Sequence, residues 1–445
     1  MKRLLAILVL ALLAVPRPGF AQTDTLKKNQ ISVGINFLAH GEYHGGGLPK
    51  PADPTEIVAD KAGFLLGRLR LNVGYKRPGI EAKAVIQNKY VWGMKGNNSL
   101  ALYEGWVKLS TRGGLFAQLG RVALSYDDER IIGPNDFAMA ALSHDVLIAG
   151  YEGHGHTAHG IFAYNQNAEN AFTNTYYING AQYYKLMQTL WYHYDVPTFP
   201  LGASLLFMNV GMQAGDPAKQ DNPPHVVWQQ MAGTYVKYSP KLFSVEASYY
   251  HQWGEYTDIT LEGRKINAWM ASIRANIRPF EKVNFELGYD FLSGDDYVPV
   301  TYGGTFGLPR HDVQQSFTPM SGSRTKFYGM LDYFYQSAYI NGFSPGLQNA
   351  FAGVNWRIID RLTIGATYHY LATGTRLNGL DSTLGHDIDL SLSLNINKYA
   401  SLVVGYTQMF GSETMRQLKQ GSGSSQGHWA WFSLVVSPEI FNVRW

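Results

Sequence analysis

Basic side chains recur at every second position of several short segments, which places them together on one face of a β-strand. Guanidinium groups bind carboxylates through paired hydrogen bonds, and ammonium groups attract them as point charges. A face of this kind would therefore draw acidic solutes toward it. The alternation assigns these residues to that face: Arg68, Arg70, Lys83, Lys89, Lys108, Lys237, Arg274 and Arg357.

Two further arginines are added to this set on other grounds. Arg121 follows Gly120, and a β-bulge at this glycine would shift the alternation and turn Arg121 toward the basic face. Arg130 lies in the charged segment 127–144, which we expect to narrow the space that the strands enclose. Local charge pairing at the base of a loop is the alternative interpretation of this segment.

Carboxylates share the basic face. Asp387 and Asp389 belong to it by the same alternation, and we include both among the candidate solute-contacting residues. Cross-strand pairs of opposite charge would hold such a face together without any ligand. Two interpretations therefore stay open, a track that attracts anions and a structural ladder of ion pairs. The other acidic members are Glu81, Glu104, Glu246, Glu286 and Asp290.

Other chemistry is weakly indicated. His154, His156 and His159 surround a short turn with only Glu152 nearby, so a solvated turn explains them better than a metal site. The adjacent residues 143–145 (Ser-His-Asp) have the side chains of a hydrolase triad, but such triads are recognised by geometry and not by adjacency. We expect no metal, no cofactor and no enzymatic activity.

The N-terminus and the composition limit the class of protein. Residues 1–21 combine Lys2 and Arg3, an apolar run and a small-x-small site, which is typical of a cleaved secretory signal. Residues 22–445 then form the exported domain. The chain has no cysteine, which excludes disulfides and thiol chemistry, and its net charge of +3 gives no reason to expect a nucleic-acid partner.

The elements that must position these side chains are short strands. Segments of alternating polarity are typical of strands with one apolar and one polar face. The 29 tyrosines, 22 phenylalanines and 10 tryptophans, with only 16% charged residues, favour a lipid-facing exterior with aromatic girdles. The predicted strands are 31–40, 64–75, 80–92, 100–110, 115–126, 145–152, 157–166, 183–195, 201–213, 226–238, 243–255, 265–277, 283–291, 348–358, 362–371, 387–397, 401–410 and 428–437.

Short and long connections alternate along the chain. This pattern is typical of outer-membrane barrels, whose periplasmic turns are short and whose extracellular loops are long. We therefore predict an all-β fold, a transmembrane antiparallel β-barrel of about 18 strands. Residues 326–334 are placed inside a long loop, 292–347, because a further strand would make the count odd. We expect this aromatic loop to fold into the lumen or to remain mobile outside it.

One stretch resembles a known family. Residues 119–136, with Gly120-Arg121 and the turn Arg130–Gly133, and then Asp145 and residues 326–334, are similar to the alginate export family of outer-membrane channels. Val122 and Phe137 depart from the Gln and Trp that are common there. The resemblance implies an 18-stranded barrel that passes a solute or a polysaccharide. The terminal Trp445 is typical of substrates of the outer-membrane barrel assembly machinery.

These observations favour a channel in the outer membrane of a Gram-negative cell, surrounded by lipid. We expect passive diffusion of small solutes or of an anionic polysaccharide through a charged lumen. The alternative is a plugged or structural barrel that acts as a surface binding protein, and an outer-membrane hydrolase is less favoured.

Overall fold

The computed structural model describes most of the chain. The predicted signal segment 1–21 lies outside the described residues. These are 29–46, 61–96, 98–166, 169, 184–215, 220, 223–255, 264–296, 301–302, 304–305, 313–323, 326–330, 345–377, 379–419 and 426–445.

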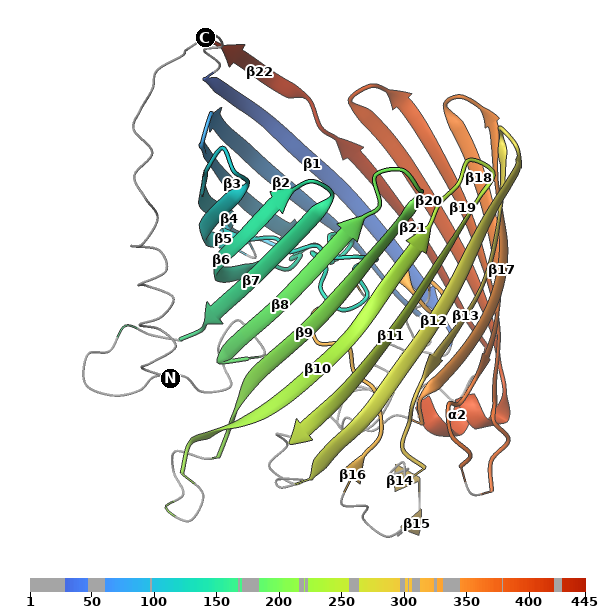
Figure 1. The fold of residues 1–445 in the computed structure, drawn as a ribbon. Helices are drawn as coiled ribbons and strands as arrows, with labels where there is room; N and C mark the ends of the chain where they lie inside the picture. The colour runs from blue at the N-terminus through green and yellow to red at the C-terminus, as the bar shows by residue number, and fades with distance from the viewer. Residues whose placement is uncertain are drawn as a thin grey trace.

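Eighteen antiparallel strands close into a barrel (Figure 1). Each long strand pairs with the next one along the chain, and β21 pairs with β1, which closes the ring. The strands are β1 Gln30–Gly45, β2 Lys61–Arg77, β3 Ile80–Val91, β4 Asn98–Ser110, β5 Leu115–Val122, β6 His144–Gly153, β7 His156–Tyr164, β8 Leu186–Asp195, β9 Leu201–Ala214, β10 His225–Tyr238, β11 Phe243–Glu255, β12 Lys265–Phe280, β13 Val283–Leu292, β17 Leu347–Ile359, β18 Leu362–Ala372, β19 Thr383–Asn397, β20 Ala400–Gly411 and β21 Gln426–Val436.

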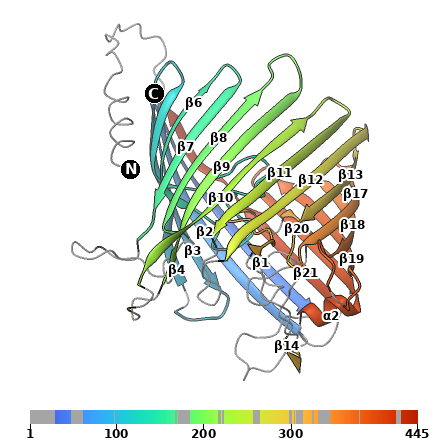
Figure 2. The same ribbon diagram turned by 60° about the horizontal axis from the view of Figure 1, so that its bottom comes forward.

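Shorter elements lie between these strands. None of the helices in the described part of the chain is long and apolar enough to cross a membrane. Figures 1 and 2 place α2 and β14 at the end of the barrel opposite the short turns. The short elements are β14 Thr301–Tyr302, β15 Gly304–Thr305, β16 Val313–Gln314, α2 Glu413–Lys419 and β22 Glu439–Arg444.

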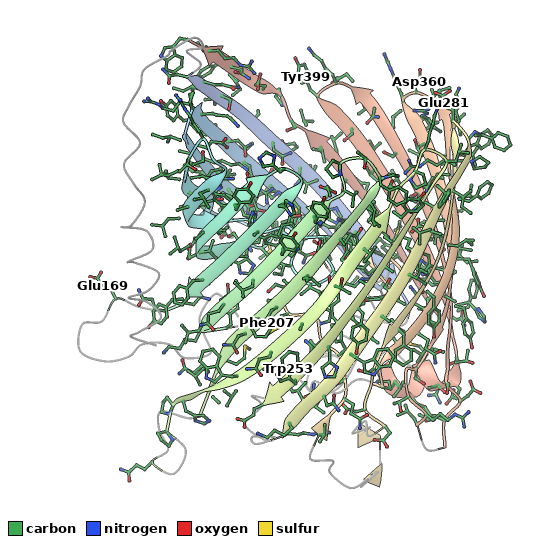
Figure 3. The ribbon with its side chains drawn as sticks, viewed as in Figure 1. Glu169, Phe207, Trp253, Glu281, Asp360 and Tyr399 are labelled. Atoms are coloured by element: carbon green, nitrogen blue, oxygen red, sulfur yellow. The ribbon has the colours of Figure 1, made fainter. Side chains whose placement is uncertain are left out.

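The alternation of side chains explains the two faces of the wall. In β2, Leu69, Leu71 and Val73 point outward and are about 40% exposed, whereas Arg68 and Arg70 point inward and are buried. An apolar exterior and a polar interior are what a strand needs when lipid lies on one side and water on the other. Figure 3 shows side chains projecting from both faces of the wall around the whole ring.

Every predicted strand occurs in the barrel, so the predicted fold class is confirmed. β1 extends to Gly45, five residues beyond its predicted end, whereas β5 ends at Val122 and not at residue 126. The chain leaves the wall there and turns into the lumen. Of the segment 326–334 that the sequence places in the long loop, residues 326–330 form a turn and no strand, and residues 331–334 lie outside the described residues.

The ring closes at an irregular seam. β21 ends at Val436, and Ser437 and Pro438 separate it from β22, because proline lacks the N–H that a continuous ladder requires. β22 nevertheless resumes antiparallel pairing with β1 after a register shift between Val33 and Gly34. The backbones of Asn29 and Trp445 exchange hydrogen bonds of 3.0 and 3.1 Å. The chain end is therefore part of the wall.

At least two of the described segments lie in the interior. Residues 123–143, between β5 and β6, are called the inner loop. Residues 326–330, within the long loop after β13, are called the aromatic turn. The two segments pack together, because Lys326 of the aromatic turn bonds to Glu129 of the inner loop at 2.7 Å. Ser321, which precedes the aromatic turn in the chain, also forms a parallel bridge with Ile132 of the inner loop. Phe327 and Tyr328 of the aromatic turn are buried.

Candidate functional site

The inner loop meets the barrel wall at two arginines of β2. Arg70 Nη1 lies 2.7 Å from one carboxylate oxygen of Asp136, and Arg68 Nη2 lies 3.2 Å from the other. Arg68 also donates to the carbonyl oxygen of Asp136 at 3.1 Å. Alternation places both arginines on the inner face, two residues apart. One carboxylate therefore serves two guanidinium groups.

Neighbouring residues position these arginines. Arg70 Nε donates to Gln87 Oε1 of β3 at 2.7 Å, and its guanidinium lies 3.8 Å from the ring centroid of Tyr103. Tyr103 reaches the inner face because β4 carries a bulge opposite Val85. Lys89 faces the same space, directly opposite Arg68 in the β2–β3 ladder. Three basic groups against one aspartate leave an excess of positive charge here, which we call the arginine site.

The next residue anchors the same part of the loop by aromatic contacts. The Phe137 ring lies 5.0 Å from that of His40 in β1 and 5.1 Å from that of Trp431 in β21, both edge-on. Edge-to-face pairs of this kind add to the stabilisation that burial provides. Phe137 thus holds Asp136 against β2 from the seam side of the barrel.

Arg130 ties the inner loop to another part of the wall. It is only 2% exposed, and its guanidinium lies 3.1 Å from Asp290 of β13 and 3.2 Å from Asp128. It donates to Tyr328 Oη at 2.9 Å and to Ser272 Oγ of β12 at 3.1 Å. Burial raises the pKa of Tyr328 to about 12, so the phenol remains neutral beside the guanidinium. Arg130 is an anchor and does not line a free passage, which corrects its sequence assignment.

A third attachment lies on β8 and β9. Asp127 accepts hydrogen bonds from Ser204 Oγ at 2.5 Å and from Trp191 Nε1 at 3.2 Å. Burial raises the pKa of Asp127, although these two donors act in the opposite direction. The adjacent Tyr126 hydrogen-bonds to His159 of β7 at 2.9 Å. The inner loop thus crosses the lumen and contacts several separate parts of the wall.

Most other basic residues that the sequence assigned to the inner face are paired with carboxylates. Such pairs fit a structural ladder better than a track of free charges. The pairs are Lys83–Glu104 at 2.7 Å, Lys108–Glu152 at 2.8 Å, Lys237–Glu246 at 3.7 Å, Arg274–Glu286 at 3.0 Å and Arg357–Glu281 at 3.4 Å.

The assignment of Arg121 to the lumen is wrong. Gly120 does adopt a positive φ of 130°, but the β4–β5 and β5–β6 ladders run through it without a register shift. Arg121 therefore shares the outer face with Leu119. There it forms a two-point ion pair with Asp145 of β6, at 2.9 and 2.7 Å. This pair lies on the exterior of the wall.

Replacing Arg121 with alanine is expected to leave ion selectivity unchanged, because its charge does not face the lumen. The loss of stability should exceed the roughly 1 kcal/mol of an ion pair in water, because the variant leaves Asp145 unpaired on the exterior of the wall. Reversal potentials across planar bilayers, recorded under a salt gradient for the native protein and the variant, check this. A shift of the selectivity toward cations in Arg121→Ala would show that Arg121 faces the lumen.

The two aspartates of β19 point inward as expected and are almost fully buried. They lie beside His369 of β18 and under the aromatic turn. Neither belongs to the arginine site. They and Arg274 face the part of the interior that the aromatic turn fills, since the Arg274 guanidinium lies 5.8 Å from the Phe327 ring.

The alternative sites do not assemble. His144 points inward and hydrogen-bonds to Tyr184, whereas Asp145 points outward to Arg121, so the adjacent triad residues lie on opposite faces of β6. His156 stacks on Tyr194, and His159 faces the lumen. Within the described ranges, no group of three potential ligands is arranged to hold a metal ion.

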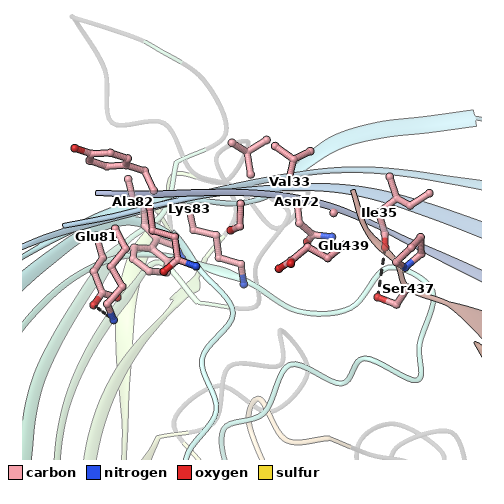
Figure 4. Close-up of a pocket in the computed structure, with 17 residues that line it drawn as sticks. Val33, Ile35, Asn72, Glu81, Ala82, Lys83, Ser437 and Glu439 are labelled. Atoms are coloured by element: carbon pink, nitrogen blue, oxygen red, sulfur yellow. Dashed lines mark hydrogen bonds and ion pairs between the residues drawn. The ribbon is translucent and has the colours of Figure 1, made fainter. Parts of the chain in front are cut away.

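A hollow of about 410 Å³ lies in the inner wall near the seam. Val33 and Ile35 point to one side of the sheet there, and Lys83 and Glu439 to the other (Figure 4). Gly34 and Gly74 face the hollow without side chains. Its basic residues are matched by acidic ones, as in the Lys76–Glu81 pair at 2.6 Å. It therefore adds no net charge at this end of the barrel.

Sequence reasoning missed several members of the arginine site. Asp136 and Phe137 lie on a loop, where alternation gives no direction. Tyr103 is the extra residue of the bulge in β4, which places it on the same face as its neighbour Glu104, against the alternation. Gln87 shares the inner face with Lys83 and Lys89, so the alternation indicates its direction, although an uncharged side chain does not by itself predict a site.

Known proteins were compared at the level of sequence and of structure. No family model and no curated protein matches the sequence. The solved structure of OccK9 (OpdG) from Pseudomonas aeruginosa superimposes with a TM-score of 0.60 at 11% identity, covering 92% of this chain and 98% of that chain. OccAB1 from Acinetobacter baumannii gives a TM-score of 0.60 at 11% identity, covering 92% and 97%. Both are outer-membrane porins. This chain therefore has the fold of an outer-membrane porin.

Proposed function

We propose that this protein is an exported outer-membrane channel that passes small solutes by passive diffusion and has no enzymatic activity. Support comes from the closed ring with its apolar exterior and charged interior, and from the porin fold. An inner loop that narrows the lumen suits small solutes, because side chains and not the wide ring then determine what passes.

We further propose that the channel prefers small anions. The excess of positive charge at the arginine site is the observation that carries this proposal. Arg68 and Arg70 share one carboxylate, and Lys89 adds a third positive charge. Within the described residues, Arg68 Nε and one terminal nitrogen of Arg70 are buried without a hydrogen-bond partner. Because Arg68 and Arg70 are only 2% and 7% exposed, their charge would act on a passing anion through its electric field and not through direct hydrogen bonds. The predicted anion-attracting track is thus limited to the arginine site. Most of the other basic residues of the inner face form ion pairs with carboxylates.

A plugged barrel that binds ligands at the surface is the second candidate. The inner loop and the aromatic turn both occupy the lumen, which favours it. Passage of an anionic polysaccharide rests on the resemblance of residues 119–136 to alginate exporters, and the structural comparisons lend it no support. Partnership with the barrel assembly machinery rests on Trp445 alone.

Ion-selectivity measurements test the channel and its arginine site together. Native protein in planar bilayers should conduct and prefer chloride over potassium. The double variant Arg68→Ala/Arg70→Ala should lower that preference by roughly threefold to tenfold, because the focused positive charge is removed. Lys237→Ala, which removes one basic residue that is paired elsewhere, is the matched control and should change it little.

Each outcome of this experiment decides a separate point. A cation preference that is the same in native and double-variant protein would contradict the anion-attracting site. Absence of conductance, together with absence of swelling in liposomes exposed to a small sugar, would establish the plugged barrel. Release of oligouronate from loaded liposomes would favour the polysaccharide alternative.

A further inference from the structure

Two carboxylic acids lie side by side under the aromatic turn. Asp387 and Asp389 are alternate residues of β19 and point to the same inner face, where they are 1% and 4% exposed. Like charges this close repel strongly when water is excluded, because the local dielectric constant is low. The site therefore needs a compensating positive charge or a proton.

The hydrogen bonds of the two acids differ. Asp389 accepts from Thr407 Oγ1 of β20 at 2.6 Å and from the backbone N–H of Met330 at 2.9 Å. Among the described residues, the Oδ1 atom of Asp387 has no hydrogen-bond partner and is covered from solvent. A buried carboxylate oxygen in this condition is costly when it carries charge and much less so when it carries a proton. Asp387 is therefore the member of the pair that favours protonation.

The aromatic turn covers this carboxyl directly. Tyr328 and Gly329 have positive φ angles of 67° and 88°, which present the backbone of the turn to β19. A Cβ built on Gly329 would lie 2.5 Å from Asp387 Oδ2, so the two groups are in close contact. At this positive φ any side chain would be strained, and it would have to displace the Asp387 carboxyl. The position of the turn thus depends on whether the Asp387 carboxyl is protonated or charged.

His369 is the nearest basic group, and its hydrogen bonds assign its proton. Asn349 donates its amide to Asp290 at 2.8 Å, so its oxygen faces His369 Nδ1, 2.8 Å away. Nδ1 therefore carries a proton, and Nε2 lies 3.5 Å from Asp389. Neutral His369 offers Asp389 a lone pair, and charged His369 offers one positive charge. In either state the two carboxylates exceed the positive charge beside them.

The remaining neighbours bring no further compensation. From β20, Thr407 and Met409 face the pair and are neutral. From β13, Asp290 is already bound to Arg130, which also holds Tyr328 of the turn. Lys326, at the start of the turn, bonds to Glu129. Arg274 of β12, which also faces this part of the interior, bonds to Glu286 at 3.0 Å. Charge balance at the two aspartates therefore depends on protons.

We propose that Asp387 is a proton-binding site whose proton holds the aromatic turn against the wall. The protonated acid sits beside Asp389 without repulsion, and the turn stays docked. As the pH rises, Asp387 loses its proton to solvent, two adjacent negative charges are buried, and the turn is released from β19. Proton binding is independent of the proposed channel function. One further expectation, that release of the turn raises the conductance, does rest on the proposed channel function.

A spin label on the turn tests this without any measurement of transport. The native chain has no cysteine, so Met330→Cys gives a unique attachment point on a half-buried side chain and keeps the backbone N–H that bonds to Asp389. The full chain, labelled and placed in liposomes, is titrated from about pH 5 to about pH 10. The ratio of mobile to immobile label should rise roughly tenfold with pH. In the Asp387→Asn background the label should remain immobile throughout.

Controls separate this site from general effects of charge. Glu152→Gln removes a carboxyl from another part of the inner wall, where it pairs with Lys108, and should leave the transition unchanged. A native titration without a mobile component, or a transition that persists in Asp387→Asn, would overturn the proposal. The native titration stands by itself should the Asn variant fail to fold. Conductance recorded in parallel shows separately whether release of the turn opens a channel.

Discussion

Replacing Arg130 with alanine is expected to detach the inner loop from the wall, destabilise the protein by about 3–5 kcal/mol and raise its conductance. The guanidinium is buried and satisfies Asp290, Asp128 and Tyr328 at once. Its removal leaves Asp290 as an uncompensated buried charge. Denaturant unfolding in detergent gives the free energy, and single-channel recording gives the conductance.

A second variant separates two effects of the substitution, the loss of the contacts that Arg130 makes and the unpaired charge that it leaves on Asp290. Arg130→Ala/Asp290→Ala removes both partners, so part of the stability should return while the conductance stays high. Arg416→Ala is the matched control, because this arginine lies exposed on α2 and pairs with Glu413 of the same helix. It should cost less than about 1 kcal/mol. Native conductance in Arg130→Ala would show that the loop holds its place without this residue.

Replacing Gly120 with alanine is expected to prevent correct pairing of β4 with β5. Its φ of 130° lies in the region that L-residues avoid, and a Cβ would overlap the Gly105 carbonyl oxygen and lie 2.8 Å from Trp106 Cα. Both contacts are to backbone, which cannot move without breaking the ladder. We expect a loss of about 3–5 kcal/mol from the strained φ and the overlap together.

Gly93 provides a control that shares only one of these features. It also has a positive φ, 79°, but no atom lies within 4 Å of the position that a Cβ would take. Gly93→Ala should therefore cost only about 1 kcal/mol. Unfolding in denaturant and the fraction of protein that resists protease after refolding measure both variants. Equal stabilities of Gly93→Ala and Gly120→Ala would show that the wall relaxes around the added methyl group.

The barrel was predictable because its constraint acts on every strand. Lipid outside and water inside require apolar and polar side chains to alternate along each strand. Neighbouring residues such as Leu69 and Arg70 show this alternation. Short turns such as 76–79 supplied the order of the strands. The end of β5 was not predictable in this way, since Leu124 and Tyr126 continue the alternation of the strand although they pack inside the lumen.

The interior was less predictable, because it depends on contacts between residues far apart in sequence. Asp136 meets Arg68 across 68 positions, and Arg130 meets Tyr328 across 198. A one-dimensional pattern contains no information on such distances. Alternation placed Arg68 and Arg70 correctly, but the inference of a bulge at Gly120 misplaced Arg121. A positive φ at a glycine alters backbone direction without always inserting a residue.

The attachments of the inner loop also have a mechanical consequence. A hollow cylinder with a thin wall flattens easily when it is squeezed from the side, and the pressure within a bilayer changes with its lipids. Here a single segment is fastened to β2 through Asp136, to β9 through Asp127 and to β13 through Arg130. It acts as a brace across the diameter. We therefore expect the contacts of the inner loop to maintain the cross-section of the barrel, so that changes in lateral pressure within the bilayer deform it little.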